Sequence, residues 1–263
     1  MLLESKNAVI YGGAGGIGRG VALTFAHEGA RVFLAGRTRE KLEQVAAGIT
    51  SAGGVAEVDV VDALDEQTVE DYLQTVVSRA GSIDISFNLI SRGDVQGIPL
   101  VEMAVEDLAH AVLTGLKANF LTARAAARYM IEQRSGVILM LTSGSSSGAI
   151  PMMGSTPPAD AATEALLRSL AAELGPQGIR VVGIWTAGVP ETLTPEKIAS
   201  VNSSMQLDAA GLERMIEGLA QMTMLRRPNA LAHVADVAAF LASDRASAIT
   251  GTIINVTTGM VSN

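Results

Sequence analysis

Residues 11–19 join an apolar run to a glycine-rich turn, and this pattern can bind a phosphate group. Glycine lets the backbone approach a pyrophosphate closely, and the N–H groups at the start of the next helix attract its negative charge. Glycine is also common in ordinary tight turns. Here, however, the turn follows the first predicted strand and opens a predicted helix. The residues expected to bind a dinucleotide are Gly12, Gly15, Gly16, Ile17 and Gly18.

The end of the second predicted strand bears on which dinucleotide is bound. An acidic side chain there would accept hydrogen bonds from the ribose of NAD and would repel a 2′-phosphate. The chain instead has Gly36 followed by Arg37, and arginine pairs readily with phosphate. We expect NADP(H) in preference to NAD(H), with Arg37 at the phosphate. The alternative is that Arg37 only pairs with a helix acid such as Glu40.

Short apolar runs alternate with amphipathic segments along the chain, and the strands and helices that they form must position the glycine turn and Arg37. The runs are β-branched with little polar alternation, which is typical of strands buried on both faces of a parallel sheet. We expect strands at 7–11, 31–35, 55–58, 83–88, 137–142, 179–185 and 252–256, and helices at about 17–28, 38–50, 66–80, 105–134, 159–174 and 233–242. The predicted fold class is α/β, a Rossmann-like, doubly wound, seven-stranded parallel sheet with helices on both faces, in a single domain over 1–263.

The segment at about 190–228 contains no predicted strand and is rich in methionine and leucine. It follows the sixth strand, at the edge where such sheets bind ligands. We interpret it as a substrate lid with an adaptable apolar inner face. The alternative is a pair of surface helices that pack on the core.

Composition excludes several classes of protein. A formal charge of −8 and a pI near 4.9 argue against a nucleic-acid partner. The absence of cysteine excludes disulfides and thiolate chemistry, and the three scattered histidines predict no metal site. The N-terminus does not resemble a signal peptide, and no apolar run reaches the ~18 residues that span a bilayer. We expect a soluble, cytoplasmic protein with no membrane partner.

The spacing Gly12-x-x-x-Gly16-x-Gly18, together with segments 178–181, 187–192 and 241–251, resembles the short-chain dehydrogenase/reductase family over nearly the whole chain. The resemblance implies that the protein self-associates as a dimer or tetramer, through the helices at 105–134 and 159–174. It also implies further cofactor contacts: Asp59 and Val60 at the adenine, Val189 and Thr192 at the nicotinamide amide, and Asn88, which opens an altered turn after the fourth strand.

The family places a tyrosine and a lysine four residues apart at its reaction centre, with a serine and a helix asparagine. Counted without gaps, these positions fall on Thr156, Asp160, Ser143 and Gly115. Asn119 lies one helical turn from Gly115 on the same face and is a candidate substitute. We therefore predict that the catalytic residues are Ser143, Asp160 and Asn119.

Threonine cannot act as a general acid near neutral pH, and aspartate cannot supply the positive charge that lowers a neighbour's pKa. Carbonyl reduction by the family mechanism is therefore not expected. One interpretation of the pair is structural: Thr156 caps the helix, and Asp160 lies in the first turn, where the dipole favours an anion. The other is that Asp160 faces the substrate and stabilises a cation, such as an iminium that accepts hydride. Arg92 and Asp94 could also approach the pocket, although we favour a solvated loop pair.

Three functions remain open. We favour an NADP(H)-dependent oxidoreductase with a non-standard active site, which transfers hydride to or from a small apolar substrate: an imine, an activated alkene or a carbonyl. The second is a non-redox lyase or isomerase that uses Ser143 with Asp160 or Arg92, and the intact glycine turn disfavours it. The third is a cofactor-binding pseudoenzyme or regulatory subunit, which the apolar lid disfavours.

Overall fold

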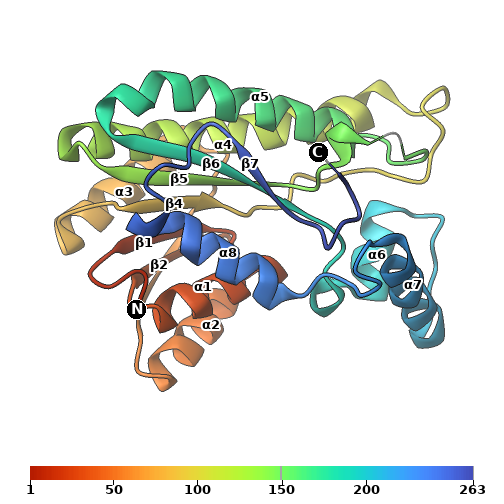
Figure 1. The fold of residues 1–263 in the computed structure, drawn as a ribbon, viewed down its shortest axis with the longest axis horizontal. Coiled ribbons are helices and arrows are strands. Elements are labelled where there is room, and N and C mark those ends of the chain that lie inside the picture. Colours follow the sequence, from red (N-terminus) through yellow and green to blue (C-terminus); the bar gives the residue numbers. More distant parts are fainter. Residues whose placement is uncertain (149, 263) are drawn as a thin grey trace.

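Seven parallel strands in the order β3-β2-β1-β4-β5-β6-β7 form the central sheet of the computed structural model, which describes residues 1–148 and 150–262 (Figure 1). The strands are β1 (Asn7–Tyr11), β2 (Arg31–Gly36), β3 (Val55–Val60), β4 (Ile85–Asn88), β5 (Gly136–Thr142), β6 (Ile179–Thr186) and β7 (Ile253–Val256). The order reverses between β1 and β4, which is the point where doubly wound sheets bind ligands. The predicted fold class is confirmed.

Helices cover both faces of the sheet (Figure 1). One face carries α1 (Gly16–His27), α2 (Arg39–Ser51) and α8 (Leu231–Ala242). The other carries α3 (Glu66–Ala80), α4 (Val105–Gln133) and α5 (Thr156–Leu174), with α4 and α5 side by side. Within the described residues, no helix is both long and apolar enough to cross a membrane.

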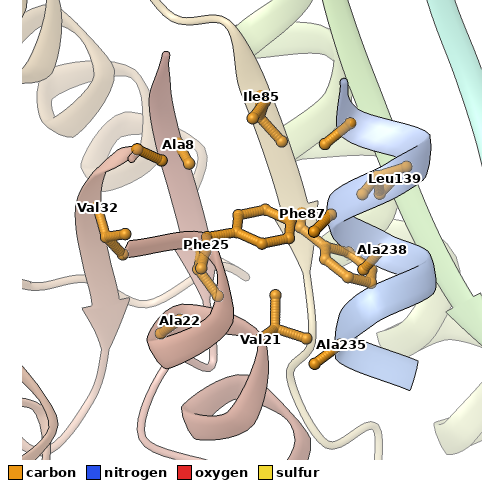
Figure 2. Packing of buried hydrophobic residues seen from close by; sticks show 14 of the residues in the cluster. Ala8, Val21, Ala22, Phe25, Val32, Ile85, Phe87, Leu139, Ala235 and Ala238 are labelled. Atoms are coloured by element: carbon orange, nitrogen blue, oxygen red, sulfur yellow. The ribbon is translucent and has the colours of Figure 1, made fainter. Parts of the chain in front are cut away.

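Each strand presents alternate side chains to the two helix layers, so the sheet has a core on each face. In β1, Ala8 and Ile10 face α1 and α8, whereas Val9 faces α3 and α4. Figure 2 shows the first core, where Phe25 of α1 and Phe87 of β4 lie between the two helices. The labelled α8 side chains that face them are the alanines Ala235 and Ala238. Their small size lets this helix pack close to the sheet.

The carboxyl ends of the strands meet at one edge of the sheet, because all seven are parallel. Beyond that edge lie α6 (Pro195–Val201) and α7 (Ala209–Met222), on the right in Figure 1. They occupy the segment at 190–228, which contains no strand in the described structure. The glycine turn and the loops after β4, β5 and β6 reach the same edge, so most of the predicted site residues are gathered there.

Several element boundaries differ from those expected, and two of these differences concern the predicted site. β3 continues to Val60, because Val60 still pairs with Gly36 of β2. α5 begins at Thr156 rather than at residue 159. Both differences change how residues of the site are placed.

Candidate active site

The turn between β1 and α1 is packed so tightly that side chains are excluded. Gly12 has a φ of +72°, in the left-handed region that favours glycine, and a Cβ there would lie 2.6 Å from the carbonyl oxygen of Leu89. A Cβ on Gly16 would lie 2.7 Å from Cγ2 of Thr192. No side chain of residues 1–148 or 150–262 caps the first turn of α1, so its N–H groups can bind an anion. The turn has the close packing and the donors that a pyrophosphate needs.

A groove of about 420 Å³ extends from this turn past the ends of β2 and β3. Arg37, Asp62 and His110 line it together with Gly12 and Gly36. The Arg37 side chain is exposed, and no ion pair with Glu40 forms among the described residues. The alternative interpretation of Arg37 as a partner of a helix acid is therefore not supported.

The predicted adenine contacts, Asp59 and Val60, are not among the described residues that line this groove. Both lie inside β3, and Asp59 is paired with Arg79 at 3.3 Å. The groove is instead lined by Val61 and Asp62. The cause is the greater length of β3, which carries Asp59 and Val60 past the point where the strand was expected to end.

Thr192, Val189 and Asn88 reach the same edge of the sheet. The Thr192 hydroxyl donates to the carbonyl oxygen of Val189 at 2.8 Å, and its side chain lies against the glycine turn at Gly16. Asn88 ends β4, and its Oδ1 accepts the N–H of Ile90 at 3.2 Å. The glycine turn therefore packs against Thr192 on one side, at Gly16, and against Leu89 on the other, at Gly12.

A small cavity of about 200 Å³ brings together the three predicted catalytic residues, Asn119, Ser143 and Asp160. Asn119 donates from Nδ2 to the carbonyl oxygen of Gly115 at 2.9 Å. Its Oδ1 is buried and has no hydrogen-bond partner within residues 1–148 and 150–262. This atom leaves an unused acceptor at the cavity.

Asp160 is fully buried and organises the loop that follows β5. Its Oδ2 accepts the hydroxyl of Ser143 at 2.5 Å, the N–H of Ser143 at 3.0 Å and the hydroxyl of Ser145 at 2.8 Å. Its Oδ1 accepts Nη2 of Arg92 at 2.7 Å. A buried carboxylate requires such a set of partners, since an unpaired one would be very costly.

The capping interpretation of Thr156 and Asp160 needs correction. Ser155 precedes the helix, Thr156 is its first residue, and Asp160 lies beyond the first turn. The carboxylate is therefore held by side chains of other elements rather than by the helix terminus. The Thr156 hydroxyl oxygen accepts Nε2 of Gln96 at 2.9 Å, and the backbone N–H of Gln96 donates to Val201, the last residue of α6, at 2.8 Å.

Arg92 and Asp94 are not the solvated loop pair that the sequence favoured. The Arg92 side chain is only 15% exposed and bridges Asp94, at 2.9 Å, and Asp160, at 2.7 Å. Burial alone would lower the pKa of Arg92, but the attraction of Asp160 and Asp94 outweighs it, so the pKa lies above the ordinary value. Arg92 is a fixed positive charge between two carboxylates.

Glu164 is a second buried carboxylate, which sequence reasoning missed. It lies one turn after Asp160 on α5 and accepts Nε1 of Trp185 at 2.8 Å and the hydroxyls of Thr142 and Ser146. Its spacing of four residues from Asp160 could have indicated this position, since residues four apart share a helix face. The described residues contain no group of three His, Cys, Asp or Glu side chains that could hold a metal ion.

A larger cavity of about 420 Å³ lies under α6 and α7. Several of its apolar lining residues come from the segment at 190–228, namely Leu193, Ile198, Val201, Met205, Met215, Leu219 and Met222. Lys197 is the only ionisable residue among the described residues that line it. Ser143 and Thr186 line both this cavity and the small polar one, so the two cavities meet there.

Two of the three tyrosines lie buried in the core between β1 and α3. The rings of Tyr11 and Tyr72 meet edge to face with centroids 5.9 Å apart. Burial raises the pKa of both hydroxyls well above the ordinary value. The third, Tyr129, packs against the same core from α4. In the part of the chain that the structure describes, no tyrosine lines either of the two cavities at Ser143.

Comparison with known proteins gives consistent similarities. The family described as enoyl-(acyl carrier protein) reductase matches residues 12–261. The 3-oxoacyl-(acyl-carrier-protein) reductase of Thermotoga maritima is 29% identical over 261 residues, which cover 99% of this chain and 100% of that protein. Among solved structures, NAD⁺-bound xylitol dehydrogenase superposes with a TM-score of 0.86 at 25% identity, covering 98% of this chain and all of the other. A short-chain type dehydrogenase/reductase from Mycobacterium marinum superposes with a TM-score of 0.83 at 26% identity, covering 99% and 97%.

Proposed function

The chain belongs to the short-chain dehydrogenase/reductase family of NAD(P)(H)-dependent oxidoreductases, and we propose that it transfers hydride between NADP(H) and a small apolar substrate at a non-standard active site. The observation that carries the proposal is the hydrogen bond between Ser143 and Asp160, which lies where the polar and apolar cavities meet. The bound nicotinamide would supply the hydride. The residues of this chain supply the binding, the orientation and the charge.

The glycine turn and the groove beside it fit a dinucleotide phosphate. Gly12 and Gly16 leave no room for a side chain, and the uncapped start of α1 offers N–H donors. Arg37 is exposed on the groove wall, where its guanidinium can bind a 2′-phosphate in a bidentate manner. This supports NADP(H) over NAD(H). Asp62 takes the adenine-side role first assigned to Asp59 and Val60.

The reaction centre departs from the family pattern, since Thr156 and Asp160 stand at the positions counted for its tyrosine and lysine. The burial of Tyr11 and Tyr72 away from the site supports this assignment, because neither hydroxyl could replace the missing one. Positive charge comes from Arg92, which Asp94 and Asp160 offset. A site without a general acid suits a substrate that needs no proton as it accepts hydride.

The cavity under α6 and α7 favours an apolar substrate. It also favours the interpretation of the segment at 190–228 as a lid, which we assign to the same single domain as the sheet. Its wall is largely methionine, leucine, isoleucine and valine, and methionine adapts to irregular ligands. We further propose that two copies pair through α4 and α5. Leu113, Phe120 and Ile131 are exposed on α4, and these large apolar side chains support self-association.

The test is a titration of the purified protein with NADPH and with NADH, followed by nicotinamide fluorescence. Micromolar binding of NADPH, at least tenfold tighter than NADH, is the expected result for a single arginine–phosphate contact, which contributes ~1.5–3 kcal/mol. Oxidation of NADPH is then measured with imines, activated alkenes and ketones. Failure of both cofactors to bind would overturn the proposal.

A further inference from the structure

The junction between the polar and apolar cavities decides which substrate atom can be bound there. Among the described residues, only Ser143 and Thr186 line both cavities. A substrate that fills the apolar cavity and reaches toward the cofactor side must therefore place its reacting end against these two residues. Whether these two residues present hydrogen-bond donors or acceptors therefore determines which class of substrate can bind.

The hydroxyl hydrogen of Ser143 is already committed. It points to Oδ2 of Asp160 at 2.5 Å, and an ionised carboxylate can only accept. A hydroxyl has one hydrogen, so Ser143 can offer the substrate only its lone pairs. Ser145 donates to the same carboxylate oxygen at 2.8 Å, and Thr186 donates to the carbonyl oxygen of Ala187 at 3.2 Å. Ser143, Ser145 and Thr186 thus act as acceptors toward the substrate, whereas the Thr156 hydroxyl, which also lines the apolar cavity, accepts Nε2 of Gln96.

Two further observations point the same way. Oδ1 of Asn119 lies buried at the small cavity with no partner in the described part of the chain, so it is one more acceptor. The charge around the site is also negative. Asp94, Asp160 and Glu164 are three carboxylates, whereas Arg92 pairs with the first two and, among the described residues, no cation pairs with Glu164. When all four groups are ionised, the cluster favours a cation.

We infer that the reacting group is a protonated imine, whose N–H⁺ donates to the hydroxyl oxygen of Ser143 beside the buried Asp160 carboxylate. This inference rests on the proposed function and narrows its substrate. The iminium carbon accepts the hydride, the C=N π pair becomes the lone pair of an amine nitrogen, and NADPH is oxidised to NADP⁺. The substrate enters with its proton, so the step needs no acid from the protein.

A ketone of the same shape lacks the complementary group. Its carbonyl oxygen would face the lone pairs of Ser143, and the negative charge that develops on it would lie near Asp160. A site built to hydrogen-bond one partner rejects an analogue that leaves its polar groups unpaired, often by orders of magnitude. The site therefore distinguishes an imine from a ketone by whether the reacting atom donates or accepts a hydrogen bond, rather than by the size of the substrate.

The experiment compares dihydroisoquinoline with tetralone, two bicyclic molecules of similar shape, as substrates for the full-length protein with NADPH in mildly acidic buffer. The expected result is a kcat/KM at least about tenfold higher for the imine. Competition by the amine product, tetrahydroisoquinoline, is measured against the alcohol, tetralol, as a readout of binding alone. Equal or faster reduction of tetralone, or failure of both the imine and the amine to bind, would overturn the inference. Loss of NADPH binding itself would instead count against the proposed function.

Two variants test the cause. In Asp160→Asn, the new amide N–H can donate to the Ser143 hydroxyl oxygen, so the Ser143 hydroxyl hydrogen becomes free to donate to a ketone. The ratio of kcat/KM for the imine to that for the ketone should then fall at least tenfold. Ser143→Ala removes the acceptor but keeps the Arg92–Asp160 pair, and it should lower the preference without loss of fold, checked by thermal melting. Ser146→Ala is the matched control, because Ser146 lies in the same loop but donates to Glu164. Unchanged preference in both test variants would contradict the assignment.

Discussion

The guanidinium of Arg92 and the buried carboxylate of Asp160 form an ion pair at 2.7 Å that ties the loop after β4 to α5. Breaking a buried pair from one side leaves a charge without a partner and costs about 3–5 kcal/mol. Arg92→Leu should therefore lower the free energy of unfolding by about that amount, measured by urea denaturation. The double variant Arg92→Leu with Asp160→Leu should recover part of the loss, because the fully buried carboxylate is gone and only the partly exposed Asp94 keeps a charge without its partner. A single variant as stable as the double one would show that the pair is not coupled.

Arg37 should set the cofactor preference. Arg37→Ala is expected to weaken NADPH binding roughly ten- to a hundredfold, because it removes a charge-assisted contact of about 1.5–3 kcal/mol, and to leave NADH binding nearly unchanged. The two Kd values are measured by fluorescence titration. Arg39→Ala is the control, since Arg39 is a neighbouring exposed arginine that pairs with Glu43. An equal loss for both cofactors would contradict the role of Arg37.

The glycine turn should tolerate no side chain. Gly16→Ala places a Cβ 2.7 Å from Thr192 and should abolish cofactor binding, because the turn and the loop after β6 must move apart. Gly218→Ala is the matched control on α7, where a Cβ meets nothing within 4 Å. It should stabilise the fold by about 0.5–1 kcal/mol, as alanine does in an exposed helix. Both are compared by NADPH titration and by thermal unfolding.

Leu219 should shape the apolar cavity. It lines the wall near Gly188, and truncation to alanine removes apolar contact with the substrate. Leu219→Ala should lower kcat/KM by about tenfold, mainly through KM, since a few methylenes contribute about 1–3 kcal/mol to binding. Leu212→Ala, on the same helix but not on the cavity wall, should leave KM unchanged. The lid assignment fails if the two variants behave alike in steady-state kinetics.

The sheet and the glycine turn could be predicted because their signals are local. Strands buried on both faces appear as short apolar runs, and glycine after the first of them marks the turn. The end of β3 differed from the expectation because the pairing of Val60 with Gly36 decides where this strand ends, and no local pattern marks that pairing.

The Arg92–Asp160 pair could not be predicted, because its members lie 68 positions apart in the chain. Each residue taken alone resembled an ordinary loop or helix-end charge. Glu164 was missed for the same reason: its partners Trp185 and Thr142 come from β6 and β5. The polar network depends on which strand ends are neighbours, and only the folded sheet determines that.

The position of Trp185 beside Glu164 lets intrinsic fluorescence report on the proposed reaction site. Trp185 is the only tryptophan in the chain, so the intrinsic fluorescence of the whole protein comes mainly from one indole, buried between β6 and α5. Its N–H donates to a carboxylate one helical turn from Asp160. A change in emission on adding a ligand therefore reports on this one place, without a label and without an average over many distant residues.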